Sequence, residues 1–426
     1  MKRLYEARPI ILPADSVSKV ILAPKDPAAA FLPGHSYVVE HYAVESAGAA
    51  TWPVRCACRL RGDSLEVEVD AAAEQEHVLR LHEQRAGELQ SLQDFSLYSL
   101  RKDLLQRRPY KGDLHMHSHH SDGKEPPAVV SAACREIGMD FMAITDHNKY
   151  EPSLEAQRAF AGLPLDFHIF PGEEVHTPDN PVHIVNFGGS FSVNALSRNE
   201  HEVEFRAEVL KRAEGMPEFP VGVDRYRYVS CLWAFDNIRR AGGIGIFCHP
   251  YWYTAHQYAP PAALTSFLLE TRPFDALELI GGYRRGETTS NLLQVARYNQ
   301  ERICGREMSI VGSSDSHGVR CGELFGWYYT IAWARSPSLE DLKESILNRY
   351  SVAVEALPGE TPRAHGPFRL VKLAQYLIRE YFQAHDTLCA QEAKWMFSHL
   401  ANDAQAAGKL AALQGQTERL YHACRA

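Results

Sequence analysis

Short apolar runs that end abruptly in polar residues follow one another through the central part of the chain, between Lys111 and Leu357. These runs are GDLHMHS, DFMAITDHN, FHIFPGEEVH, VHIVNFGG, GGIGIFCHP, ALELIGG and MSIVGSSDSHG. Segments in which apolar residues recur with helical spacing lie between several of them, at 128–136, 233–240, 289–302 and 338–348. Strands that alternate with helices predict a parallel sheet, either open or closed into a barrel. In such α/β folds, functional side chains gather where the strands end.

The first part of the chain has a different pattern. Short runs rich in Val, Ile and Tyr, several of them alternating polar with apolar residues, occupy 17–23, 36–44, 52–60 and 64–69. Clusters of Pro, Gly and Asp separate them, which is typical of strands joined by turns. We therefore expect a small antiparallel β domain over residues 1–71.

Two further segments flank the central domain. Val78, Leu79 and Leu81 begin an apolar series with near-helical spacing, so a helical linker is expected over 72–110. Residues 358–426 predict helices that pack on the outside of the domain formed by 111–357. The expected organisation is thus a β domain, a linker, an α/β domain and a helical C-terminal segment.

Composition and charge exclude some classes of protein. Apolar residues make up 45% of the chain and charged residues 23%, which is ordinary for a folded globular protein. The net charge of −8 disfavours a protein whose main task is to coat long nucleic acids. No apolar run approaches the roughly 18 residues of a membrane-spanning helix. The nine cysteines are scattered without a CxxC pair, and the N-terminal residues lack the apolar run of a secretory signal, so reduced thiols and a cytoplasmic location are expected.

Histidines concentrate in one part of the sequence. Eight of the twenty fall within residues 115–183. His115 and His117 stand two apart in Asp-Leu-His-Met-His, and residues two apart on a strand point to the same side. Their imidazoles are therefore expected to converge, while Leu114 and Met116 face the other way. Asp122 follows in Ser-Asp-Gly, a sequence that on its own is more often a turn.

Other candidate ligands stand at the ends of the remaining runs. They are His147 after FMAIT, Glu173 after HIFPG, His183 before IVNF, His249 after GIGIFC, and Asp315 with His317 after MSIVGSS. Any one of them could be a capping residue or a hydrogen-bonded core histidine. Together they indicate a metal site, because buried charge at this density is costly unless it is paired or metal-bound. Mixed imidazole and carboxylate ligands suit Mn, Zn or Fe without discriminating among them.

The motifs HMH with SDG, TDHN, FCHP and SDSH together resemble those of the PHP (polymerase and histidinol phosphatase) superfamily of metallohydrolases, over about 111–355. This resemblance implies an α/β fold, a distorted (β/α)7 TIM-like barrel, here preceded by the small antiparallel β domain. It also implies two or three divalent metal ions at the mouth of the barrel.

The resemblance assigns each candidate ligand to a metal position. One ion would be held by His115, His117, Glu173 and Asp315. Glu173 would bridge to a second ion that also takes His183 and His249. A third site would consist of Asp122, His147 and His317. Asp113, Asp146 and His176 could orient ligand imidazoles or be plain polar groups at strand ends.

The favoured function is a metal-dependent phosphoesterase that hydrolyses a small phosphorylated metabolite, a nucleotide or a sugar phosphate. Attack by a metal-bridging hydroxide is the expected chemistry, with Glu173, His249 and Asp315 at the catalytic centre. Cationic groups are needed for the phosphate oxygens. Arg284 and Arg285 are the first candidates, because they follow ALELIGGY, a run that lacks a metal ligand of its own.

Two alternatives keep the metal centre and change the substrate. A carbamate or aryl-ester hydrolase would suit the aromatic residues near the ends of the runs, namely Tyr251, Trp252, Tyr253 and Tyr283. An exonuclease on short single-stranded oligonucleotides is also consistent with the superfamily, although the negative net charge weighs against it. The expected partner is a small phosphoester, with neither a membrane nor a long nucleic acid, and homo-oligomer formation is left open.

Overall fold

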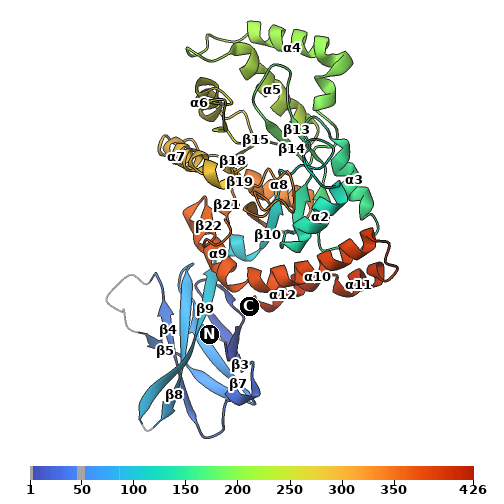
Figure 1. Cartoon of the computed structure of the whole chain (residues 1–426). Coiled ribbons are helices and arrows are strands. Elements are labelled where there is room, and N and C mark those ends of the chain that lie inside the picture. Colours follow the sequence, from blue (N-terminus) through green and yellow to red (C-terminus); the bar gives the residue numbers. More distant parts are fainter. Residues whose placement is uncertain (1–2, 46–52, 86) are drawn as a thin grey trace. The chain divides into compact units, whose positions relative to one another are not determined.

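The computed structural model describes residues 3–45, 53–85 and 87–426 (Figure 1). The chain divides into two compact units. Unit 1 consists of residues up to Arg108 together with Arg379–Tyr381 and Gly415–Ala426. Unit 2 consists of Pro109–Ile378 and Phe382–Gln414.

Unit 1 is built from two sheets. One has the strand order β1-β3-β7-β6, with β1 at Tyr5–Arg8, β3 at Val17–Pro24, β7 at Ser64–Asp70 and β6 at Cys58–Arg61. The other has the order β2-β9-β8-β4-β5, with β2 at Ile11–Pro13, β9 at Glu88–Leu100, β8 at Glu76–Arg85, β4 at Ser36–Ala43 and β5 at Val54–Arg55. The described pairs are antiparallel except β2–β9, which is parallel. The predicted runs 17–23, 36–44 and 64–69 match β3, β4 and β7, whereas Trp52 of the fourth run lies outside the described residues.

The predicted helical linker over 72–110 is wrong. Its place is taken by the long strands β8 and β9, which form a hairpin, and only the short α1 (Lys102–Leu105) is helical. The physical reason is that His77, Leu79 and Leu81 alternate toward the interior with a period of two. Since this unit needs strands to complete its core, a series of apolar residues that fits both periodicities becomes a strand.

Unit 2 contains two larger sheets (Figure 1). The first has the order β12-β11-β10-β20-β21-β22, from His168–Phe170, Phe141–Ala143, Arg108–Asp113, Tyr328–Ala334, Ser351–Glu355 and Arg363–His365. The second has the order β13-β14-β15-β18-β19, from Gly172–Val175, Ile184–Phe187, Ile244–Phe247, Ala276–Gly281 and Ile310–Ser313. The two sheets contact each other where β19 lies against β20 and β21. Closure into a (β/α)7 barrel stays a prediction.

The alternation of strands and helices predicts a parallel sheet, but the strands of unit 2 are not all parallel. β10–β11–β12 and β15–β18–β19 are parallel, but β14 runs antiparallel to both β13 and β15. Residues 176–183 alone connect β13 to β14, and a parallel crossover needs about a dozen residues or more. Because β14 runs in the opposite direction to β13, His183, which directly precedes β14, lies at the edge of the sheet where β13 ends.

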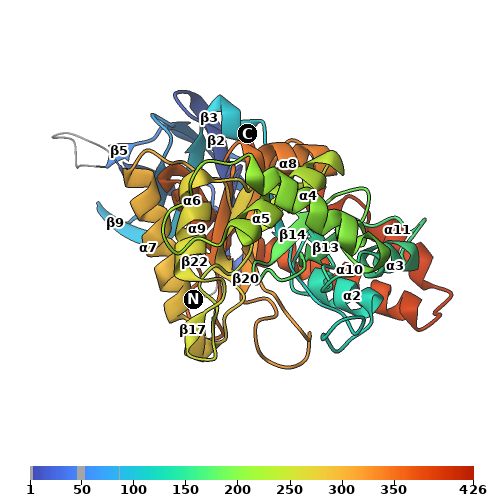
Figure 2. The same cartoon turned by 90° about the horizontal axis from the view of Figure 1, so that it is seen from above.

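The four helices predicted between strands are present. They are α2 (Pro127–Glu136), α5 (Arg225–Arg240), α7 (Thr289–Ile303) and α8 (Leu339–Leu347). Three helices were not predicted: α3 (Glu151–Ala159), α4 (Glu202–Glu214) and α6 (Ala262–Thr271). In the second sheet α5 contacts β15 and α7 contacts β18, so these helices cover its strands (Figures 1 and 2).

The C-terminal segment is helical, as expected, but its helices are divided between the two units. It comprises α9 (Phe368–Glu380), α10 (Phe382–Leu400), α11 (Ala406–Leu413) and α12 (Gln416–Ala423). α10 contacts α2, where Arg135 forms a buried ion pair with Glu392, whereas α12 belongs to unit 1. None of the helices in the described ranges combines the length and the apolar character needed to span a bilayer.

A buried chain of hydrogen bonds crosses the second sheet of unit 1. His41 Nε2 lies 2.9 Å from His77 Nδ1, and His77 Nε2 lies 2.8 Å from Ser99 Oγ. Ser99 Oγ donates to the carbonyl oxygen of Ala73 at 2.6 Å, so it accepts from His77. Burial lowers the pKa of His41 and lowers the pKa of His77 to about 4. Both imidazoles are therefore neutral in the folded protein near pH 7.

This pair predicts that unit 1 loses stability in acid. Unfolded His77 takes up a proton near its usual pKa of 6.5, whereas folded His77 does so only near 4. The free energy of unfolding should therefore fall as the pH drops from 6.5 to 4, by up to about 3 kcal/mol. Hydrogen exchange of β4, β8 and β9, corrected for the intrinsic exchange rate, measures this change. His77→Gln should show a shallower dependence, and an equal slope in both proteins would contradict the prediction.

Candidate metal centre

Side chains from the ends of several strands of unit 2 converge on one point. We call this group the histidine–carboxylate cluster. It consists of His115, His117, Asp122, His147, Glu174, His176, His183, His249, Asp315 and His317. All the metal ligands predicted from the sequence are members except Glu173.

The carboxylate of Glu174 lies at the centre of the cluster. Its two oxygens lie within 3.6 Å of ring nitrogens of His115, His117, His147, His176, His183 and His249. His183 Nδ1 is 2.8 Å from Oε1, and His176 Nε2 is 3.4 Å from Oε2. The reversed strand β14 explains the position of His183, which precedes that strand and so meets the end of β13.

Glu173, the carboxylate predicted to bridge two metal ions, points away from the cluster. It accepts hydrogen bonds from Ser192 Oγ at 2.8 Å, Val193 N at 2.5 Å, Asn194 Nδ2 at 3.0 Å and Asn186 Nδ2 at 3.2 Å. Successive residues of a strand face opposite sides, so only one of the two adjacent carboxylates can reach the cluster. The structure gives that position to Glu174 and makes Glu173 an anchor for the 192–194 segment.

The first two histidines converge as the HxH spacing predicts. Their Nε2 atoms lie 3.3 Å apart, although β10 already ends at Asp113 and Met116 is held by an isolated bridge to Ser316. Asp315 Oδ1 lies 2.9 Å from His117 Nε2 and 3.3 Å from His115 Nε2. These contacts bring together the motifs HMH and SDSH, whose residues His117 and Asp315 lie 198 positions apart in the sequence.

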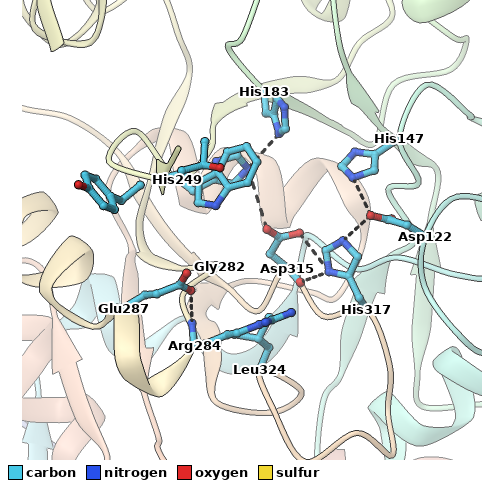
Figure 3. Close-up of a pocket in the computed structure, with 13 residues that line it drawn as sticks. Asp122, His147, His183, His249, Gly282, Arg284, Glu287, Asp315, His317 and Leu324 are labelled. Carbon is cyan, nitrogen blue, oxygen red and sulfur yellow. Dashed lines mark hydrogen bonds and ion pairs between the residues drawn. The ribbon is translucent and has the colours of Figure 1, made fainter. Parts of the chain in front are cut away.

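A second carboxylate organises the outer side of the cluster. Asp122 Oδ2 lies 3.2 Å from His317 Nε2 and 3.5 Å from His147 Nε2 (Figure 3). Burial alone would raise the pKa of Asp122, but the hydrogen bonds from His147 and His317 hold it well below its usual range. Asp122 is therefore an ionised ligand candidate rather than a simple turn residue.

The donor set fits divalent metal ions. Both oxygens of Glu174 are buried and face imidazole nitrogens. Ring nitrogens also face one another, with His183 Nδ1 3.2 Å from His249 Nε2 and His147 Nδ1 3.1 Å from His176 Nε2. Convergent imidazole nitrogens around a buried carboxylate are the ligands of Zn, Mn or Fe.

Part of the cluster has the protonation that a metal ion requires. Burial alone would raise the pKa of Glu174, but nearby His183, His115 and His176 lower that pKa well below its usual range. Burial lowers the pKa of His183 to about 4, so its imidazole is neutral near pH 7. Metal ions bind ionised carboxylates and neutral imidazoles. Burial alone would lower the pKa of His147, but Asp122 and Glu174 instead raise it to about 10, so an ion bound there would displace a proton.

Two buried carboxylates orient His115, and only one of them was considered from the sequence. Glu278 Oε2 on β18 lies 3.0 Å from His115 Nδ1, and its Oε1 accepts from the backbone N of His249 at 3.1 Å. Asp113 accepts from the backbone N of His115 at 3.3 Å and of Ser314 at 3.0 Å, and burial raises its pKa to about 7. A carboxylate on the far nitrogen of a ligand imidazole fixes its orientation toward the metal. A single acidic residue in the apolar run ALELIGG was the signal for Glu278.

Asp146 acts on the loop that carries Ser118 and Ser121. It accepts from Ser118 N at 2.8 Å, from Ser118 Oγ at 2.6 Å and from Ser121 Oγ at 2.5 Å. Ser121 Oγ in turn lies 3.4 Å from His117 Nδ1. Asp146 therefore positions His117 through Ser121 and makes no direct contact of its own to that imidazole.

Two of the cluster residues have strained backbones. The φ angle is 26° at His249 and 51° at Asp315, in the left-handed region that side chains with a Cβ rarely adopt. Such conformations persist where the surrounding structure imposes them, and they concentrate at functional sites.

A cavity of about 380 Å³ opens over the cluster (Figure 3). Its lining is Asp122, His147, His183, His249, Trp252, Tyr253, Thr254, Gly282, Arg284, Glu287, Asp315, His317 and Leu324. Arg284, predicted to bind phosphate, lines this cavity, and its Nε lies 3.4 Å from Glu323 Oε2. Arg285, the second predicted arginine, is not part of the lining and donates to the carbonyl oxygen of Pro358 at 2.8 Å. A short 3-10 helix spans Arg285–Glu287, and Arg284 directly precedes it. The side chains of the two adjacent arginines therefore point in different directions, and that of Arg285 lies outside the cavity.

Part of this unit is similar to a known family and to known proteins. Residues 113–212 match the model of the PHP domain. The DNA polymerase/3'-5' exonuclease PolX of Bacillus subtilis is 43% identical over 61 residues, which are 14% of this chain. The match spans only 11% of the length of PolX.

Solved structures with some likeness to this chain are distant. A two-domain protein from Bacteroides vulgatus, which contains a predicted PHP-like metal-dependent phosphoesterase, is 17% identical over 64% of this chain and 71% of its own, with a TM-score of 0.43. An amidohydrolase from Chromobacterium violaceum, solved with bound sulfate and no metal, is 18% identical over 49% of this chain and 87% of its own, with a TM-score of 0.29. Neither likeness carries an argument about the reaction.

The neighbouring carboxylates of β13 provide a matched pair of variants. Glu174→Gln should lower metal affinity by more than the roughly 10–100-fold that loss of an outer partner costs, because it removes the central ligand. Glu173→Gln should keep the metal and lower the free energy of unfolding by about 2 kcal/mol, because it weakens charge-assisted hydrogen bonds. Metal content after dialysis and thermal unfolding measure the two effects. Metal loss in Glu173→Gln alone would contradict this assignment.

Proposed function

We propose that this chain, whose residues 113–212 match the PHP domain, is a metal-dependent phosphoesterase that hydrolyses a small phosphorylated metabolite such as a nucleotide or a sugar phosphate. The observation that carries the proposal is the buried, ionised Glu174 among imidazole nitrogens. Its partners His183 and His249 line a cavity that also has Arg284 on its wall. A cavity of about 380 Å³ has the size of a small-ligand site.

The cluster offers ligands for more than one ion. His115, His117 and Asp315 would hold one ion, and His183 and His249 a second, with Glu174 between them. Asp122, His147 and His317 would hold a third. Divalent ions bound there would supply an activated water and would neutralise charge on the phosphate oxygens.

The remaining residues bind and orient. Arg284 stands on the cavity wall with about two thirds of its side chain exposed, so its guanidinium can donate to non-bridging phosphate oxygens. Glu278 and Asp113 hold His115 in place, so the ligand geometry is set before substrate binds. Trp252 and Leu324 supply apolar surface to an otherwise polar wall and so reduce the access of bulk water.

An assay of phosphate release tests the function directly. The purified protein loaded with Mn²⁺ should release phosphate from p-nitrophenyl phosphate and from members of a nucleotide panel, and EDTA should abolish the release. The same preparation should be tested against a naphthyl carbamate and a short single-stranded oligonucleotide. Turnover of either of these without phosphate release from the small esters would replace the proposed function with the corresponding alternative.

The adjacent arginines give a sharper prediction. Arg284→Ala should lower kcat/KM for a phosphate ester by about 10–100-fold, the value of a hydrogen bond to a charged group. Arg285→Ala should leave kcat/KM close to that of the unaltered protein, because its side chain binds the Pro358 carbonyl. Steady-state kinetics with p-nitrophenyl phosphate at matched metal content measures both. Equal losses in the two variants would show that Arg284 has no specific role at the phosphate.

A further inference from the structure

An exposed aromatic hairpin stands at the mouth of the candidate active site. It consists of β16 (Tyr253–Thr254) and β17 (Gln257–Tyr258), and Trp252, which directly precedes it, stands three residues after His249 (β17 is labelled in Figure 2). Among the described residues, four aromatic side chains are exposed, and three of them belong to this segment: Trp252, Tyr253 and Tyr258. Exposed aromatic residues gathered on one short element mark a surface that binds something.

The hairpin separates two cavities and contributes to both. Tyr253, half exposed, lines the cavity over the cluster and also a second cavity of about 610 Å³. Trp252 lies closer to the metal ligands, with its ring centred 6.0 Å from that of His183 and 6.1 Å from that of His249. The two cavities therefore share Tyr253 as a lining residue, so a substrate bound at the cluster can extend along this side chain toward the second cavity.

The second cavity combines flat aromatic surface with hydrogen-bonding groups. Its lining includes Arg227, His256, Gln257 and Tyr258. The ring of Tyr258 meets that of Tyr253 edge-on, with centroids 5.7 Å apart, and thereby supports it. A planar ring with a polar edge fits this combination, because its face can stack on tyrosine while its edge meets polar side chains.

The hairpin is held in a strained conformation. Its two turn residues, Ala255 and His256, have φ angles of 47° and 64°. Two-residue turns of this kind strongly prefer Asn-Gly and similar pairs, because both positions need positive φ. Strain of this sort indicates a function for the element that carries it.

The hairpin is also tied to the metal centre. Trp252 N donates to the carbonyl oxygen of His249 at 3.0 Å, and Ala259 N donates to the carbonyl oxygen of Trp252 at 2.8 Å. The preceding Tyr251 donates its N–H to the hydroxyl of the buried Tyr283 at 3.2 Å. These bonds fix the aromatic surface relative to His249, so it can act as a preformed binding surface.

We propose that this hairpin binds the base of a nucleoside phosphate, with Tyr253 as the stacking surface between the two cavities. The proposal rests on the proposed phosphoesterase function and adds a substrate class to it. The phosphate lies over the cluster near Arg284, and the base lies against Tyr253 with its polar edge toward Gln257 and Arg227.

Binding of nonhydrolysable phosphonates to the metal-loaded protein tests this proposal by titration calorimetry. An adenosine phosphonate should bind about tenfold more tightly than methylphosphonate, the lower end of what base stacking contributes. Tyr253→Ala should lose this preference, so that the two compounds bind it with similar affinity. Tyr253→Phe keeps the ring and should retain the preference, which separates stacking from a loss of folding.

The outcomes separate this proposal from the one on which it rests. Equal binding of the adenosine and methyl compounds, or a preference that survives in Tyr253→Ala, would overturn the role of the hairpin while phosphate release remains. Phenylphosphonate that binds as tightly as the adenosine compound would overturn the nucleoside assignment. If none of the esters releases phosphate in the separate kinetic assay, the proposed phosphoesterase function itself is wrong.

Discussion

The buried carboxylate of Glu174 is the group on which the rest of the site depends. An ionised carboxylate is among the most costly groups to bury unless it is paired or bound to a metal. Here six histidines surround it, and strands from both sheets of unit 2 supply them. Divalent ions held by these imidazoles would compensate for that burial, so the fold that gathers the histidines also prepares a metal site.

The reversed strand β14 is the feature of the fold that makes this arrangement work. In an all-parallel sheet, the residue that precedes a strand lies at the opposite edge from the active site. The short connection after β13 forces β14 to run antiparallel, which brings His183 within 2.8 Å of Glu174. A local constraint on chain length thus places His183 in the histidine–carboxylate cluster.

Spacing along the sequence was sufficient where two candidate ligands stand two residues apart. His115 with His117, and Asp315 with His317, share one side of an extended segment, and all four lie in the cluster. The pair Glu173 and Glu174 could not be separated in this way, since GEEV gives no apolar alternation to show which side faces the core. The strand β8 was assigned to a helix for a related reason: Val78, Leu79 and Leu81 fit a helical spacing until tertiary pairing with β4 and β9 decides the period.

His249 connects the histidine–carboxylate cluster with the aromatic hairpin that stands over it. It contributes Nε2 to the group around Glu174, its backbone N–H is held by Glu278, and its carbonyl oxygen accepts from Trp252 at the base of the aromatic hairpin. A φ angle of 26° at this residue turns the chain sharply from the buried β15 toward the exposed hairpin. Relaxing that turn would shift the ligand and the aromatic surface together, which is a physical reason for the protein to keep a strained residue at this position.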